Sequence, residues 1–207
     1  MKKFLLFLSI PIFLIGIVSA AQAITIGYSF QLSGNANVPT VTLTNNSTLA
    51  DITQFTMTIG NTSYNFDAAW NVPPGSPIDS YTLNSPDTNS GGGTRSDSIN
   101  YTFTGFDPGE TFQFDADVHI DNNNTNEDYR TVLFNNGGAP NSAITVEFSD
   151  STIMNGILPD FTSSPYIFSQ IRTTDNGTNG TVPEPTTMLL FGSGLIGLAG
   201  FRRNFKK

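Results

Sequence analysis

One stretch decides the fold: residues 99–120 read Ile99-Asn-Tyr-Thr-Phe-Thr-Gly-Phe-Asp-Pro-Gly-Glu-Thr-Phe-Gln-Phe-Asp-Ala-Asp-Val-His-Ile120. Apolar residues alternate with polar ones before the turn at Asp107-Pro108-Gly109, and they alternate again after it. Successive side chains of a β-strand point to opposite faces of the sheet. This alternation therefore predicts two half-buried strands, one on each side of a turn.

Similar short patterns recur through the centre of the chain, at residues 24–32, 55–59, 64–66, 129–134, 144–148 and 166–171. The segments 55–59 and 64–66 flank a four-residue turn and are predicted to pair as a hairpin. Residues 71–97 hold four prolines and a Gly-Gly-Gly run, which predicts a long loop. No sustained helical period occurs between residues 24 and 172. The predicted fold class is therefore all-β, an antiparallel β-sandwich or jelly roll.

The N-terminal residues predict a secretory signal peptide over residues 1–23. A charged start at residues 1–3 precedes an apolar run over 4–18, and Ala21-Gln22-Ala23 supplies an A-x-A cleavage site. The run is shorter than the roughly 20 residues that cross a bilayer, so cleavage is favoured over a permanent anchor. The predicted partners are a Sec-type export machinery and a signal peptidase.

The C-terminal end contains three zones in a fixed order: Pro183-Glu184-Pro185, an apolar segment over 186–201, and a basic end over 202–207. Both prolines lack a backbone N–H and hold the chain extended, so Glu184 lies outside any helix, where a processing enzyme can reach it. The apolar segment predicts a single short transmembrane helix, and the basic end is expected to stay cytoplasmic. Residues 24–172 would then be an exported domain, followed by a flexible linker over 173–182.

This tail resembles the PEP-CTERM sorting signal of Gram-negative bacteria, over residues 183–207 of the 207-residue chain. The resemblance implies recognition by an exosortase, a membrane-embedded processing enzyme, with Pro183, Glu184 and Pro185 as the recognised residues. It also implies an inner-membrane intermediate, followed by delivery to the cell surface or the extracellular matrix. Members of this family commonly belong to bacteria that produce exopolysaccharide and form biofilms or flocs.

The region between the two ends is strongly acidic. Residues 24–182 contain sixteen Asp and Glu, three Arg and no Lys, which gives a formal charge of −13. Phosphate binding needs a basic stripe, and six of the nine basic residues of the chain lie in its first three and last six positions. Nucleic acid is therefore excluded as a predicted partner. The chain has no cysteine, which excludes disulfides and thiolate metal sites.

Acidic residues gather on one face of the strand predicted over 112–120. If the apolar positions face the core, then Asp115, Asp117, His119 and Asp121 project from the opposite face. Clustered carboxylates suit calcium, so Asp115, Asp117 and Asp121 form the predicted calcium site, if a metal binds here at all. A solvated acidic face without a metal is the favoured interpretation, because acid-rich turns are common. His119 itself is expected to be a surface residue.

Motifs for catalysis are sparse. The single histidine, His119, has no G-x-S-x-G serine to activate, so no Ser-His-Asp triad is predicted. A glycosidase needs two carboxylates, and a pair of Glu110 or Glu147 with an aspartate stays open, although no spacing marks one. We therefore expect no enzymatic activity.

Two functions fit the predicted fold and the predicted extracellular location. The favoured prediction is an exported structural or adhesive protein of the cell surface or of a biofilm matrix rich in exopolysaccharide. The alternative is a lectin-like carbohydrate-binding module, with or without calcium, in which Trp70 or Tyr64 stacks on a sugar ring. For Trp70, packing in the core is the favoured prediction because its apolar area is large.

Overall fold

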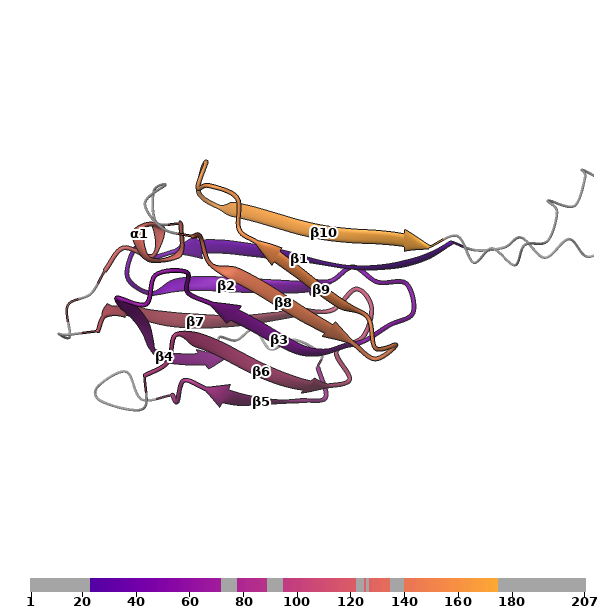
Figure 1. Ribbon diagram of the computed structural model, residues 1–207. Coiled ribbons are helices and arrows are strands. Elements are labelled where there is room, and N and C mark those ends of the chain that lie inside the picture. The colour runs from indigo at the N-terminus through magenta and orange to yellow at the C-terminus, as the bar shows by residue number, and fades with distance from the viewer. Residues whose placement is uncertain are drawn as a thin grey trace, which may run out of the picture. The chain divides into compact units, whose positions relative to one another are not determined.

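Two antiparallel five-stranded sheets make up the part of the chain that the structure, a computed structural model, describes (Figure 1). The first sheet has the order β10 (Tyr166–Thr174), β1 (Ile24–Gly34), β2 (Pro39–Asn45), β7 (Thr111–Ile120) and β4 (Tyr64–Asn71). The second sheet has the order β5 (Ser80–Ser85), β6 (Ser98–Thr104), β3 (Ile52–Thr58), β8 (Ala143–Phe148) and β9 (Ile153–Ile157). The predicted all-β antiparallel fold class is confirmed.

The structure describes residues 23–71, 78–88, 95–121, 125, 127–134 and 140–174. Residues 23–174 belong to one structural unit. The predicted sorting tail, with its helix over 186–201, lies outside the described residues, as does the predicted signal peptide except for Ala23. Within the described ranges, no helix is long and apolar enough to cross a membrane.

Aromatic side chains from both sheets form the centre of the core. The Phe55 ring of β3 lies 6.2 Å from that of Phe30 in β1 and 5.9 Å from that of Phe114 in β7, measured between ring centroids. The Tyr101 ring of β6 lies 4.9 Å from that of Phe114. All four side chains are buried. The inward positions of the alternating pattern thus meet between the sheets, where removal of apolar area from water stabilises the fold.

The predicted hairpin between residues 55–59 and 64–66 does not form. These segments belong to β3 and β4, which lie in different sheets, and the turn between them carries the chain from one sheet to the other. The same is true of β6 and β7 on either side of the Asp107-Pro108-Gly109 turn. Alternation identifies a strand and its buried face, but the partner strand is set by packing between distant segments.

The segment 129–134, predicted as a strand, is instead the short helix α1 (Tyr129–Phe134). Asp128 precedes this helix, and its Oδ1 accepts a hydrogen bond of 2.9 Å from the backbone N–H of Arg130. Such an N-cap satisfies an amide that a first helical turn leaves without a partner. The helix buries Tyr129, Val132, Leu133 and Phe134. Six residues are too few to show a helical period in the sequence.

Three strands were not predicted: β2, β5 and β9. β5 lies inside the segment 71–97, which was expected to be loop throughout, and it forms an edge of the second sheet. Its sequence signal is short, with only Tyr81 and Leu83 as apolar residues, and the prolines and glycines around it favoured a loop. In the fold, Tyr81 is 46% exposed and Leu83 is half-buried. At the other end, β10 pairs with β1 as far as Thr174, which places two residues of the segment expected as a linker in the sheet.

Candidate functional site

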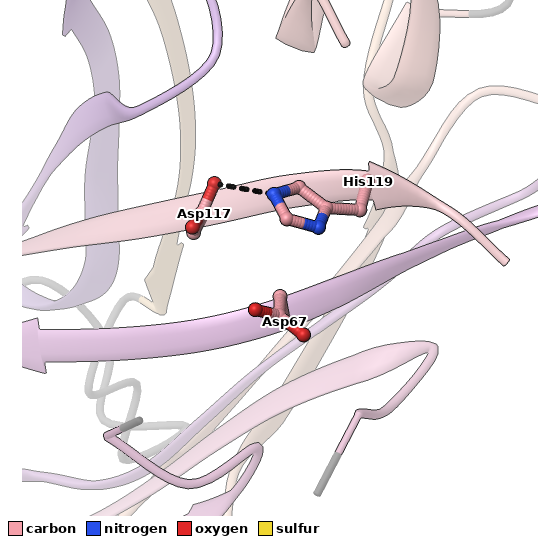
Figure 2. A group of neighbouring side chains, drawn as sticks. All are labelled: Asp67, Asp117 and His119. Atoms are coloured by element: carbon pink, nitrogen blue, oxygen red, sulfur yellow. Dashed lines mark ion pairs between the residues drawn. The ribbon is translucent and has the colours of Figure 1, made fainter. Parts of the chain in front are cut away.

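A buried polar cluster lies on β4 and β7, formed by Asp67, Asp117 and His119 (Figure 2). Each residue contributes one nitrogen or oxygen atom to a group in which all three atoms lie within 4.8 Å of one another. The exposed fractions are 1% for Asp67, 6% for Asp117 and 4% for His119. Ionisable groups are rarely buried to this extent unless they are paired or bind a cation.

Asp117 and His119 share a face of β7 because they are two residues apart in the same strand. The neighbouring core residues Ala116 and Val118 point between the sheets, so the cluster lies on the opposite face of the first sheet. Every second position of β7 thus serves the core, and two of the intervening positions, Asp117 and His119, belong to the cluster.

A β-bulge in β4 brings Asp67 to this cluster. Phe66 pairs with Val118, but the next registered pair is Ala68 with Asp117, so Asp67 is the additional residue in β4. Two residues of β4 therefore oppose Asp117, and regular alternation resumes with Ala69 in the core. Bulges re-aim side chains in this way, and they are frequent next to functional sites.

Arg95 is the ion-pair partner of Asp67. Its Nε lies 2.7 Å from Asp67 Oδ1. The arginine is held there because the next residue, Ser96, forms an isolated β-bridge with Phe66, one residue from Asp67. The guanidinium compensates the buried Asp67 carboxylate, whose charge would otherwise be costly to remove from water.

Asp117 and His119 are less well satisfied. His119 Nε2 lies 3.2 Å from Asp117 Oδ1. Neither of these atoms has a hydrogen-bond partner, and nor does His119 Nδ1, although all three are buried. The contact is therefore electrostatic rather than an aligned hydrogen bond. Burial raises the pKa of the Asp117 carboxyl above its usual range; the imidazole of His119 lowers it, and the nearby Asp67 raises it further.

The structure does not group the three residues of the predicted calcium site. Asp115 is half-buried, and its Oδ1 accepts a 2.7 Å hydrogen bond from Thr40 Oγ1. Asp121 is exposed just beyond β7, and its Oδ1 accepts a 2.7 Å hydrogen bond from Asn65 Nδ2. Of the three, Asp117 alone belongs to the cluster with Asp67 and His119 that the described residues form.

The prediction that His119 is a surface residue is wrong, because the structure buries it. Alternation in β7 correctly placed its side chain opposite the core, but that face of the sheet is not open to solvent at this end of the strand. Asp67 is a further residue of the cluster, and it was not predicted. The available signal was an acidic residue inside an otherwise apolar strand, Phe66-Asp-Ala-Ala-Trp70, where a charge needs a compensating partner.

The other candidate residues lie apart from this cluster. The prediction that Trp70 packs in the core is wrong: Trp70 is half-buried and pairs with Asp115 in the register of β4 and β7, outside the core. Tyr64 is also half-buried, but it packs against the core. Glu110 accepts a hydrogen bond from the Asp107 N–H in the turn between β6 and β7, and Glu147 lies on β8 of the other sheet.

Comparisons with known proteins bear on the tail and the fold. Residues 181–204 match the model of the PEP-CTERM protein-sorting motif. A comparison with curated proteins gave no match. Among solved structures, the chain is similar to an uncharacterized protein from Nocardia farcinica with an immunoglobulin-like fold, at 15% identity and a TM-score of 0.35. That similarity covers 67% of this chain and 95% of the other.

Proposed function

Because residues 181–204 carry the PEP-CTERM sorting motif, we propose that this chain is an exported protein that an exosortase processes and delivers to the cell surface or the extracellular matrix. Its folded part, residues 23–174, would act there as a structural or adhesive β-sandwich rather than as an enzyme. The predicted signal peptide starts the export, and the predicted C-terminal helix holds an inner-membrane intermediate until the tail is processed.

The sorting motif is the observation that carries this proposal. A proline-flanked glutamate, a short apolar segment and a basic end follow one another within the last 25 residues. Each has a physical role in sorting: an extended peptide that an enzyme can bind, a marginal membrane anchor, and a charge that stays in the cytoplasm. The acidic central region keeps the exported part soluble through charge repulsion.

Replacing Glu184 with alanine tests the sorting step. We expect the full-length chain to accumulate in the inner membrane, because the carboxylate between the two prolines is the distinctive group of the motif. Export of the folded part should continue, since the signal peptide is unchanged. The measurement is the apparent mass and the membrane fraction of the chain on an immunoblot.

Asp175→Ala is the matched control, because it removes a carboxylate nearby in the sequence but outside the motif. It should be processed like the natural chain. If Glu184→Ala is processed normally as well, the glutamate is not recognised and the proposed sorting route is wrong.

Four exposed isoleucines support an adhesive role. Ile153 and Ile157 lie on β9, and Ile167 and Ile171 lie on β10, with exposed fractions between 51% and 65%. A groove of about 630 Å³ lies between these two strands. Both are edge strands of their sheets, and exposed apolar edges favour association with other molecules.

The half-buried Trp70 supports the alternative, a lectin-like module, because aromatic rings outside a core can stack on sugars. A pull-down with isolated exopolysaccharide distinguishes the two functions. For a structural or adhesive protein that does not bind glycan, we expect the same low retention for the natural chain and for Trp70→Ala. Retention of the natural chain that is lost in Trp70→Ala would establish the lectin-like module instead.

A further inference from the structure

The cluster of Asp67, Asp117 and His119 contains polar atoms that the fold does not satisfy. His119 offers two buried ring nitrogens without a hydrogen-bond partner, and Asp117 Oδ1 is in the same state. A neutral imidazole normally donates from one nitrogen and accepts at the other. Burying such groups without partners is costly, so the arrangement points to a ligand that accepts electron pairs from both residues.

A fourth unsatisfied atom lies at the neighbouring register position. Asn65 pairs directly with His119 across β4 and β7, and it is 4% exposed. Its amide orientation is fixed, because the Asp121 carboxylate accepts the hydrogen bond and Nδ2 must be the donor. The remaining atom, Asn65 Oδ1, is buried and has no partner.

We propose that Asp67, Asp117 and His119 bind a zinc ion. Zinc sites in proteins combine imidazole nitrogen with carboxylate oxygen, and three protein ligands are a common set. Ligand atoms around a tetrahedral zinc ion lie about 3.3 Å apart, given bonds of roughly 2.0 to 2.1 Å. The 3.2 Å between His119 Nε2 and Asp117 Oδ1 is close to this value, and the cluster as a whole lies within 4.8 Å. Rotation of the side chains would bring the remaining ligand atoms of the cluster to the separation that zinc requires.

Zinc fits this cluster better than calcium. Calcium prefers six to eight oxygen ligands, whereas this cluster has few oxygens and one imidazole. Charge also favours a bound cation: Arg95 compensates Asp67, but Asp117 has no cationic partner unless His119 is protonated. The rival interpretation is a purely structural network, with one ion pair from Arg95 to Asp67 and another from protonated His119 to Asp117.

The proposed zinc ion would cross-link two strands of the first sheet, β4 and β7. β4 is an edge strand and pairs with β7 on one side. A metal bound by Asp67 of β4 and by two residues of β7 would link the strands through side chains in addition to their backbone hydrogen bonds. Because the ligands assemble only in the folded state, metal binding should stabilise the fold.

The test uses the tag-free full chain, stripped of metal with a chelator. We expect one zinc per chain by mass spectrometry after gel filtration. We also expect the melting temperature to rise by about 5–10 °C at a zinc concentration one hundred times the Kd. The chain has a single histidine and no cysteine, so the imidazole NMR signals of His119 should shift on zinc addition.

The variants separate the cluster from the acidic face around it. Asp117→Asn and His119→Gln should each abolish the zinc-dependent rise in melting temperature. Asp115→Asn is the matched control: it makes the same charge change on the same face of β7, but at a residue outside the cluster. It should respond to zinc like the natural chain.

Three results would overturn the proposal. The first is an equal melting temperature in zinc and in chelator, together with unshifted imidazole signals, which would leave the structural network as the explanation. The second is stabilisation by calcium but not by zinc. The third is a zinc response that persists in both cluster variants. The binding and NMR measurements on the natural chain remain decisive if either variant fails to fold.

Discussion

Replacing Phe114 with alanine is expected to destabilise the sandwich by about 4 kcal/mol. Phe114 is fully buried on β7, and its ring lies 4.9 Å from the Tyr101 ring and 5.9 Å from the Phe55 ring of the opposite sheet. The alanine variant loses the transfer free energy of the ring and leaves a cavity between rigid aromatic neighbours. Such cavities collapse only in part, which adds to the cost.

Thermal unfolding of the purified chain measures this effect. For a domain of this size, a loss of about 4 kcal/mol corresponds to a fall in melting temperature of roughly 8–16 °C. Ile167→Ala is the control, because this isoleucine is 64% exposed on β10 and its loss should change stability by no more than about 0.5 kcal/mol. Similar melting temperatures for the two variants would mean that the sheets do not pack through Phe114.

Replacing Asn45 with alanine is expected to cost about 3 kcal/mol. Asn45 is fully buried at the end of β2. Its Nδ2 donates 2.9 Å hydrogen bonds to the carbonyls of Ala50 and Phe106, and its Oδ1 accepts a 2.9 Å hydrogen bond from the N–H of Ser47. Alanine would leave the Ala50 carbonyl and the Ser47 N–H without this partner, whereas the Phe106 carbonyl keeps a 3.0 Å hydrogen bond from the Ile52 N–H. Each buried group left unsatisfied is penalised by roughly 1 to 3 kcal/mol.

The position of these bonds explains why the effect should be large. Ala50 lies between β2 and β3, and Phe106 lies between β6 and β7, so one side chain joins two of the segments that cross from sheet to sheet. Chemical denaturation should show the lower unfolding free energy. Asn84→Ala is the control: Asn84 also donates hydrogen bonds, but at an exposed site in β5, so its loss should change little. Equal unfolding free energies for the two variants would contradict the bridging role of Asn45.

The features that depend only on the order of residues along the chain, such as the sorting motif, could be predicted from the sequence. Sorting depends on an order of short zones, Pro183-Glu184-Pro185 followed by an apolar and then a basic segment, and such an order needs no tertiary contact. The fold class was also accessible. Alternation along residues 24–32, 99–103 and 112–120 correctly marks strands with one buried face, because the period of side-chain direction in a strand is a local property.

Local signals failed where an element is short or lies at an edge. α1 has six residues, and its helix depends on the cap from Asp128 and on burial of Val132, Leu133 and Phe134. β5 is largely exposed and has only two apolar residues, Tyr81 and Leu83, and backbone pairing with β6 holds it in place.

The sequence by itself determined the C-terminal sorting motif, the acidic character and the strand-rich fold of this protein. The tertiary structure alone decided which strands are neighbours, since β3 and β4 enter different sheets despite their short connection. It also decided the candidate site, because a bulge in β4 brings Asp67 to Asp117 and His119 from far along the chain. The physical reason is the same in both cases: pairing and burial depend on contacts between distant segments, and those contacts exist only once the chain has folded.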